Sequence, residues 1–357
     1  MRIFMLVQHP DAGGPVSKHG FVLVDALRSL GCTVVTHPWG RRSPDEPLSS
    51  KLTQRLRDVA SIGSAVRREP FDVAVVKTSH DWRTLARDCA VVPVLRSRCP
   101  TVLQLHGSRA HWLDAPGHRA FKLATAALLA AVDGVLVLST EEQRQWQSFR
   151  ARPPVVPVKN PYVRNSHLEG AHPANPPRLL FVGRLLTEKG IFELVDAFAD
   201  VGREVESELV LVGGGPQERA LRERIRARGL EDRVALRGHL TGPELAEEYR
   251  AATAFVLPSW SEGFPTVLAE AMDAGLPIVT TRIRGAADHL VDGEHALFVE
   301  PRDVAGLTQA LVTVLRDSEL RARMAAANRK RVAMFAPDAV AAEFVAALES
   351  MLRARSA

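Results

Sequence analysis

A chain of 357 residues with 46% apolar and 24% charged side chains can bury two globular cores, which excludes a disordered chain and a small disulfide-stapled domain. Its net charge of +5 is uneven, because residues 1–165 hold 23 Lys and Arg against 13 Asp and Glu, and the remainder holds 23 against 28. A basic first half suits an anionic partner, such as a phosphorylated acceptor or an anionic lipid surface, or it is simply a solvated arginine-rich surface.

The sequence shows no sign of export or of membrane insertion. Cys32, Cys89 and Cys99 are too few and too irregularly spaced for a disulfide framework or a zinc pattern. The apolar run 3–7 is too short for a signal peptide, and the longest apolar stretch, 123–138, is interrupted by an Asp-Gly pair. We therefore expect a cytoplasmic protein, either free or attached peripherally to the inner face of a membrane.

Short apolar strands alternate with helical segments through the first half of the chain. We expect helices at 19–30 and 52–68, and strands at 3–7, 33–36, 73–76, 101–105 and 135–138. Strands that are apolar throughout and separated by helices predict a parallel sheet covered on both faces. The proline-rich segment 152–177 is the best candidate for a linker.

After this segment the alternation starts again. We expect helices at 191–201 and 217–228, and strands at 179–182, 209–212, 234–237, 254–257, 278–280 and 296–298. The sequence therefore predicts an α/β protein with two Rossmann-like, doubly wound domains, 1–165 and 166–337, which face a cleft at the carboxyl ends of their strands. A last helix, 338–357, is expected to pack back on the first domain.

Two glutamates stand out in the second half. Pro265 suits the first turn of a helix and Gly275 suits the position just after its end, so Glu262 lies in the loop before this helix and Glu270 lies within it. The neighbours of Glu270 are nearly all apolar, which predicts a partly buried carboxylate. Sugar hydroxyls are suitable donors to it, and a neighbouring loop or an arginine are the structural alternatives.

Charged and glycine-rich turns follow the strands upstream. Glu262 adjoins the N–H groups of a helix start, where it either accepts from hydroxyls or merely stabilises the helix. Arg184 and Lys189 lie on one loop after a strand, where they either hold a diphosphate or are ordinary surface charges. The turn at 211–216 departs from G-x-G-x-x-G spacing, which argues against a dinucleotide cofactor.

These features together resemble glycosyltransferase family 4. The E-x7-E spacing of Glu262 and Glu270, with Ser-Glu-Gly-Phe-Pro before it and Gly-Leu-Pro after it, is similar to the family's signature. The resemblance is strong over residues 178–300 and weaker over 1–165. It implies the GT-B fold and a retaining transfer of sugar from a nucleotide diphosphate-sugar to a sugar, lipid-linked or small-molecule acceptor, without a metal, another cofactor or nucleic acid.

The resemblance also implies roles for individual residues. Glu270 would bind the ribose, Glu262 the transferred sugar, and Arg184 with Lys189 the diphosphate. His106 resembles a histidine near the reacting sugar, or it is a capping or core histidine. His106, Glu262, Arg184 and Lys189 would thus be catalytic. Further donor contacts are implied for Gly13, Gly14, Gly183, Gly213, Gly238, His239, Leu240, Gly263, Phe264, Pro265, Thr266 and Val267.

Departures from the family pattern leave rival functions open. The segment 159–164 lacks the usual Gly and Asp of the interdomain region, and 284–288 lacks a Gly-Gly pair. The chain has no D-x-D motif, which favours catalysis by protein cations instead of a metal. A nucleotide-sugar epimerase, a phosphorylase and a non-catalytic nucleotide-sugar-binding protein are the alternatives, although no pyridoxal phosphate lysine is recognisable. The sequence does not identify the base, the sugar or the acceptor.

Overall fold

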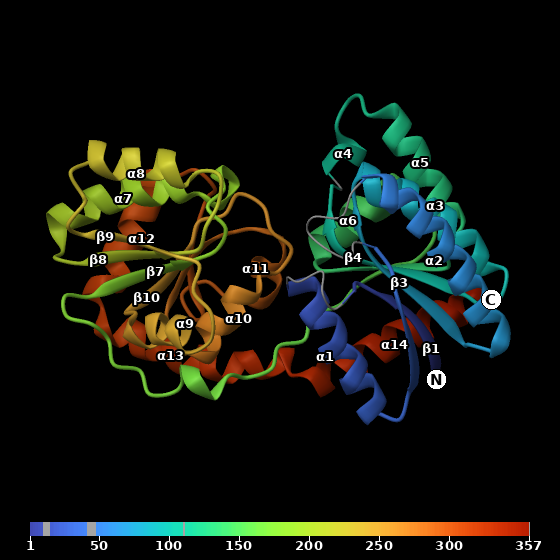
Figure 1. The fold of residues 1–357 in the computed structure, drawn as a ribbon. Helices are drawn as coiled ribbons and strands as arrows, with labels where there is room; N and C mark the ends of the chain where they lie inside the picture. The colour runs from blue at the N-terminus through green and yellow to red at the C-terminus, as the bar shows by residue number, and fades with distance from the viewer. Residues whose placement is uncertain (10–14, 41–47, 110, 357) are drawn as a thin grey trace. The chain divides into compact units, whose positions relative to one another are not determined.

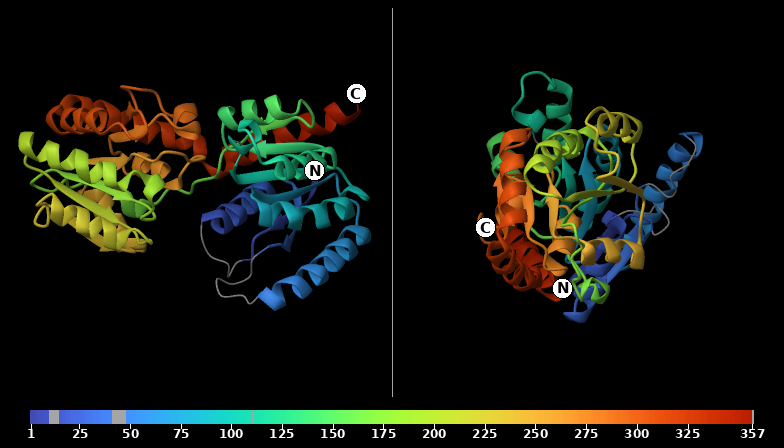
Figure 2. Two further views of the ribbon diagram at one scale, coloured as in Figure 1. Left: turned by 90° about the horizontal axis from the view of Figure 1, so that it is seen from above. Right: turned by 90° about the vertical axis from the view of Figure 1, so that its left-hand side faces the viewer.

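The computed structural model describes residues 1–9, 15–40, 48–109 and 111–356, which form two compact units. Unit 1 comprises Met1–Val163 with Phe335–Ala357, and unit 2 comprises Arg164–Met334. Each unit is a parallel sheet with helices on both faces (Figures 1 and 2). In these four described ranges no helix is both long and apolar enough to cross a bilayer.

Unit 1 is built on six parallel strands in the order β2-β1-β3-β4-β5-β6. The strands are β1 (Arg2–Val7), β2 (Thr33–Pro38), β3 (Val73–His80), β4 (Thr101–Ser108), β5 (Gly134–Val137) and β6 (Val155–Pro157). The helices are α1 (Pro15–Ser29), α2 (Leu48–Arg68), α3 (Trp82–Arg96), α4 (His111–Asp114), α5 (Arg119–Ala130), α6 (Thr140–Phe149) and α14 (Pro337–Ser356).

Alternate residues of these strands enter two separate cores. Val76 and Leu103 point to the face covered by α2, α3, α5 and α6, whereas Val75 and Val102 point to the face covered by α1 and α14. Successive side chains of a strand lie on opposite faces, so an uninterrupted apolar strand is what a sheet with two covered faces requires.

Helix α14 belongs to the core of unit 1 although it comes last in the chain. Phe344 and Leu348 are fully buried among residues of β1 and α1 (Figure 1). A Cβ atom on Gly134 would lie 2.3 Å from Met351 Sδ, so the helix packs directly on the strand backbone. The N–H of Tyr162 donates to the Phe335 carbonyl at 2.7 Å, which joins the two segments that lead to and from unit 2.

Unit 2 repeats the architecture with the strand order β12-β11-β10-β7-β8-β9. Its strands are β7 (Arg178–Val182), β8 (Glu208–Val212), β9 (Val234–Gly238), β10 (Ala254–Leu257), β11 (Ile278–Thr281) and β12 (Ala296–Val299). Its helices are α7 (Ile191–Glu204), α8 (Glu218–Ala227), α9 (Gly242–Ala251), α10 (Thr266–Asp273), α11 (Arg284–His289), α12 (Val304–Arg316) and α13 (Ser318–Arg331), and short 3-10 turns lie at Ser166–Leu168, Thr187–Lys189 and Val332–Phe335.

Every strand predicted from the sequence is present, but the predicted linker is only partly a linker. Its first part forms β6, which pairs in parallel with β5 at Val155 opposite Val135. The chain passes from one unit to the other between Val163 and Arg164. The prolines that indicated a linker are compatible with β6 because it is an edge strand, where a missing N–H can face away from the sheet.

Candidate functional site

The strand order of the sheet in unit 2 reverses at β7, which pairs with β8 on one side and with β10 on the other. In open α/β sheets, ligands bind beside the carboxyl ends of the strands at such a switch point. The loops after β7 and β10 both leave from it. They are joined there by a hydrogen bond from the Trp260 N–H to the Glu188 carbonyl at 2.8 Å.

The same two loops bring together two residues that were predicted to act separately. Lys189 Nζ forms an ion pair with Glu262 Oε1, and both side chains are about four-fifths buried, with 19% and 18% exposed. Burial lowers the pKa of Lys189, the charge of Arg184 lowers it further, and Glu188 opposes them. Arg184 is therefore close enough to Lys189 for its charge to act on it.

Glycine turns connect the loops after β7, β8 and β9. The N–H of Gly213 donates to the Gly238 carbonyl at 2.7 Å. A Cβ on Gly213, whose φ is +135°, would lie 1.9 Å from the Gly183 carbonyl oxygen. Gly183, Gly213 and Gly238, three of the glycines predicted to contact the donor, thus lie next to one another, and His239 and Leu240 follow directly after Gly238.

Helix α10 ends where the sequence predicted but begins one residue later, because Pro265 lies just before the first turn and not in it. It starts at Thr266 after the extended residue Pro265, which provides no side-chain cap. It ends in a left-handed glycine: Gly275, with φ of +69°, donates to Met272, and the next residue donates to Ala271. The positive end of the helix dipole therefore lies beside Glu262 and Gly263.

Glu270 is half-buried within α10, as its apolar neighbours indicated, and it has a partner that the sequence analysis did not predict. The Tyr249 hydroxyl donates to Glu270 Oε2 at 2.7 Å, and Tyr249 itself is only 1% exposed. Because Tyr249 lies on α9, an adjacent helix fixes the direction of this carboxylate.

The segment that departs from the family pattern also reaches α10. Arg164 Nε donates to Asp273 Oδ1 at 2.7 Å, and the Asn165 N–H donates to Asp273 Oδ2 at 2.8 Å. These bonds hold the C-terminal end of α10 from the first residues of unit 2. The nearby loop of Gly263 is held as well, by a hydrogen bond from the Gly285 N–H at 2.9 Å.

In unit 1, Gly13 and Gly14 lie outside the described residues, and His106 lies near the end of β4. Both ring nitrogens of His106 are shielded from solvent, and neither makes a hydrogen bond of good geometry in the part of the chain that the structure describes. Burial, followed by the charges of Lys77 and His19, holds the His106 pKa well below its usual range, while Asn160 acts in the opposite direction. The imidazole is therefore neutral near pH 7.

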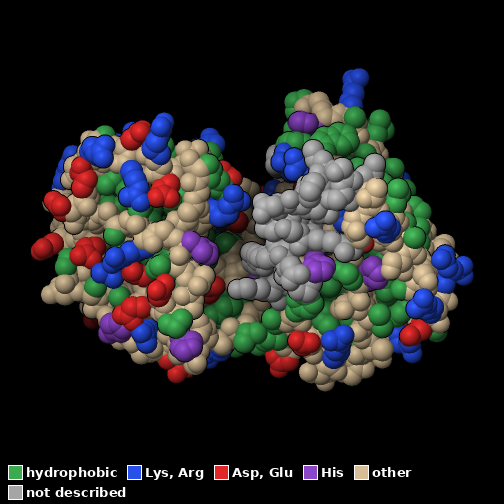
Figure 3. Space-filling view, in the orientation of Figure 1, with side chains coloured by type: hydrophobic (Ala, Val, Ile, Leu, Met, Phe, Trp, Pro, Cys, Tyr) green, Lys and Arg blue, Asp and Glu red, His purple; other side chains and the backbone are tan. Residues whose placement is uncertain are grey.

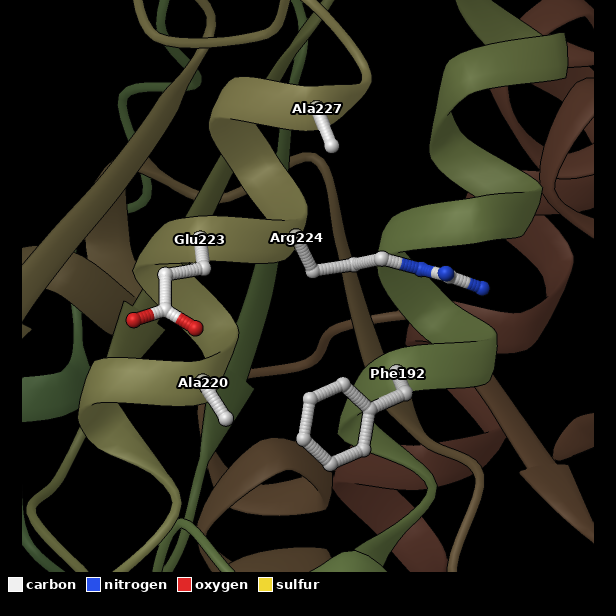
Figure 4. Close-up of a pocket in the computed structure, with 5 residues that line it drawn as sticks. All are labelled: Phe192, Ala220, Glu223, Arg224 and Ala227. Carbon is white, nitrogen blue, oxygen red and sulfur yellow. The ribbon is translucent and has the colours of Figure 1, made fainter.

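A surface groove on unit 2 includes none of these residues in its lining. It is lined by Phe192 of α7 and by Ala220, Glu223, Arg224 and Ala227 of α8 (Figure 4). Arg224 reaches across it toward α7 and is bound to Asp196, with Nε 2.8 Å from Oδ1.

On the face drawn in Figure 3, acidic and basic side chains of unit 2 are intermixed. Among the described residues, no group of three His, Cys, Asp or Glu could hold a metal ion.

Comparisons with known proteins agree with this arrangement. Residues 164–331 match the family described as glycosyl transferases group 1, and residues 14–162 match glycosyltransferase family 4. Glycogen synthase from Mycobacterium tuberculosis is 37% identical, with 93% of this chain and 90% of the relative covered. Phosphatidyl-myo-inositol mannosyltransferase from Mycobacterium leprae is 28% identical, with 98% and 97% covered.

Solved structures with the same fold span both units. Sucrose-phosphate synthase from Thermosynechococcus elongatus superimposes with a TM-score of 0.76 at 21% identity, covering 99% of this chain and 100% of that one. HepE from Anabaena, solved in complex with UDP-glucose, superimposes with a TM-score of 0.74 at 20% identity, covering 98% and 100%.

Proposed function

Because this chain belongs to glycosyltransferase family 4 and has the GT-B fold, we propose that it transfers a sugar with retention of configuration and without a metal ion, from a nucleotide diphosphate-sugar to an acceptor hydroxyl. That it is a glycosyltransferase with a nucleotide-sugar donor follows from the family. The observation that best supports the finer proposal is the meeting of Lys189, Arg184 and Glu262 at the switch point of unit 2.

In this proposal the donor's diphosphate lies against Arg184 and Lys189. Cleavage of a sugar–phosphate bond leaves negative charge on the departing diphosphate, and fixed cations in a partly dry site stabilise that charge. The start of α10 adds its dipole and the backbone N–H groups of residues 264–267. A sequence without a D-x-D motif needs such protein groups if no metal takes part.

The two glutamates divide the donor's hydroxyls between them. Glu270, held by Tyr249, accepts from the ribose, and Glu262 accepts from the transferred sugar. In the unliganded protein Glu262 is paired with Lys189, so an arriving diphosphate competes for the lysine and releases the carboxylate toward the sugar. The backbone around His239 and Leu240 faces the base.

Retention is proposed to follow a front-face course. The bond from the anomeric carbon to the phosphate oxygen breaks, the bond to the acceptor oxygen forms on the same face, and the phosphate oxygen takes the acceptor's proton. His106, neutral by virtue of its burial, lies near the reacting sugar in this proposal. The acceptor itself is assigned to unit 1 and the donor to unit 2.

The experiment begins by identifying the nucleotide through thermal-shift screening of UDP, GDP, ADP and TDP. Proton NMR of the first product, made with the matching donor in the presence of excess chelator, then reports stereochemistry and metal dependence together. We expect a retained anomer at an unchanged rate. An inverted product, or no product until a divalent metal is added, would overturn the proposed mechanism while leaving the family assignment intact.

A Glu262→Gln variant tests the non-covalent role of that residue. An amide still accepts hydrogen bonds, so we expect residual turnover, whereas a covalent nucleophile would lose all activity and would leave a trappable glycosyl-enzyme. An epimerase would convert the donor without an acceptor, and a non-catalytic binding protein would bind the donor without consuming it.

A further inference from the structure

A cluster of polar side chains lies at the carboxyl edge of the sheet in unit 1. This sheet has its own switch point at β1, which pairs with β2 on one side and with β3 on the other. Strand β3 contributes Lys77, three residues before its end at His80, and β4 contributes Gln104 and His106. Lys77 and Gln104 are register partners on the face covered by α1, since Val75 and Val102, two positions earlier, belong to the core on that face.

The polar groups of this cluster are buried without well-placed hydrogen-bond partners. Lys77 is 7% exposed and Gln104 is 1% exposed. Within the described residues, Lys77 Nζ, Gln104 Oε1, Asn160 Oδ1 and both ring nitrogens of His106 make no hydrogen bond of good geometry, although Asn160 lies close enough to His106 to raise its pKa. Native proteins satisfy most buried polar groups, because each unsatisfied one is costly. Several together in one place indicate a site that is completed by a ligand.

The charge of the cluster specifies what that ligand is. The charged groups that act on His106 are Lys77 and His19, both basic, and no carboxylate contributes to the pKa of either Lys77 or His106. Burial lowers the pKa of Lys77 to about 7. Lys77 Nζ lies 3.6 Å from the Cβ position of Gly20, early in α1, whose positive dipole end is directed to the same edge. An anion would accept from the Lys77 ammonium and from the single N–H of the neutral His106, whereas the side-chain carbonyls and the other ring nitrogen are acceptors that it would not satisfy.

We propose that this cluster binds a phosphate monoester carried by the acceptor, with Lys77 as its cationic contact and as a residue that selects phosphorylated acceptors. The proposal rests on the proposed function, which assigns the acceptor to unit 1. A tetrahedral dianion at this edge pairs with Lys77 Nζ and accepts from His106, while the rest of the acceptor extends toward the carboxyl edge. Arg184 and Lys189 of unit 2 remain the cations assigned to the donor's diphosphate.

The first experiment compares wild type with Lys77→Met, in which an apolar side chain of similar length replaces the lysine. Calorimetry at constant ionic strength measures the affinity for inorganic phosphate, glucose 6-phosphate and glucose, with the preferred nucleotide diphosphate as a separate ligand. We expect Lys77→Met to bind both phosphates roughly 10- to 100-fold more weakly, the effect of one charge-assisted hydrogen bond, and the nucleotide equally well. Lys330→Met, the same change at an exposed lysine of α13, should alter none of these affinities.

Thermal unfolding of the unliganded proteins distinguishes a ligand site from a structural lysine. Removing a buried, unpaired ammonium should raise the melting temperature of Lys77→Met above that of wild type, whereas loss of a lysine that stabilises the fold would lower it. Phosphate should then stabilise wild type and leave Lys77→Met unchanged.

The second experiment needs no variant and uses sulfate, whose charge does not change near neutral pH. Calorimetry at pH 8 in two buffers of different ionisation enthalpy counts the protons that accompany binding. We expect uptake close to one proton, on the order of one charge regained by Lys77, because His106, whose pKa is held well below its usual range, stays neutral at this pH.

Each of the remaining outcomes would contradict either the acceptor site or the donor site. Nucleotide affinity that falls together with phosphate affinity in Lys77→Met would place Lys77 on the donor and overturn the acceptor site. A wild type that binds nucleotide but neither phosphate nor sulfate would overturn the anion site and leave the glycosyltransferase proposal standing. A wild type that binds phosphate but no nucleotide would instead contradict the proposed donor site.

Discussion

At the scale of single residues, substitutions of Glu270 and Tyr249 distinguish a residue that contacts the ligand from one that only orients that residue. Glu270→Ala should weaken nucleotide binding roughly 10- to 100-fold, because it removes a charged acceptor, whereas Tyr249→Phe removes one hydrogen bond to that acceptor and should cost less. Calorimetry with the preferred nucleotide and with its 2′-deoxy analogue measures both effects. A folded Glu270→Ala protein with unchanged affinity would exclude the ribose role.

Replacing Arg184 and replacing Lys189 should change the stability of the protein by different amounts, although both residues are proposed to contact the same diphosphate. Alanine at either position should lower turnover by roughly 10²–10³-fold, the usual cost of one preorganised electrostatic group. Arg184 is exposed, so its loss should leave thermal unfolding unchanged, whereas loss of Lys189 leaves Glu262 partly buried and unpaired and should cost about 1–3 kcal/mol.

The control ligand for these two variants is the nucleoside, which has the same base and ribose but no diphosphate. Affinity for the nucleotide diphosphate should fall in both variants, while affinity for the nucleoside should stay the same. Equal losses for both ligands would show that the cations do not contact the diphosphate.

The sequence identified these residues better than it identified their partners. The spacing of Glu262 and Glu270 is a local pattern, and the helix between Pro265 and Gly275 follows from proline and glycine chemistry. Tyr249 lies 21 positions before Glu270 on a separate helix, so only the packing of α9 against α10 brings them together. Lys77 gave no signal at all, because a single lysine at the end of an apolar strand is unremarkable until its burial is seen.

At the scale of elements, the adjacent glycine turns of unit 2 offer a matched pair of substitutions. Gly213→Ala requires a side chain at φ of +135° and 1.9 Å from the Gly183 carbonyl oxygen, so we expect a loss of about 1–3 kcal/mol in stability and weaker nucleotide binding. Gly214→Ala adds the same methyl group to open space and should change neither. Urea unfolding and nucleotide titration of both variants provide the measurement, and equal effects at the two positions would contradict it.

Two of the elements that the sequence analysis missed, α3 and β6, have identifiable physical causes. Helix α3 carries Pro93 in its interior, which normally argues against a helix, although Asp81 and Thr84 form a capping box that marks its start. Strand β6 is short and proline-containing, so its β character depends on pairing with β5. Hydrophobic periodicity predicted the secondary structure of long apolar segments correctly, and it failed where pairing with a distant strand decides the structure.

At the scale of the whole molecule, the division into units predicts separable stabilities. Phe344→Ala should destabilise unit 1 by about 3–5 kcal/mol, because it empties a fully buried position between α14 and the sheet. Amide hydrogen exchange should accelerate in β1 and β3 and stay unchanged in β7 and β10. Glu349→Ala, at an exposed position of the same helix, is the control, and faster exchange in both units would show that they unfold as one.

The place of α14 in unit 1 also dictates an order of assembly during synthesis. Unit 2, Arg164–Met334, leaves the ribosome as one uninterrupted stretch and has every element it needs before the last helix is made. The sheet of unit 1 appears first but must wait through the translation of unit 2 for the helix that covers Ile3 and Met5. We therefore expect the domain encoded second to mature first, and the nascent first domain to be the part that depends on chaperones.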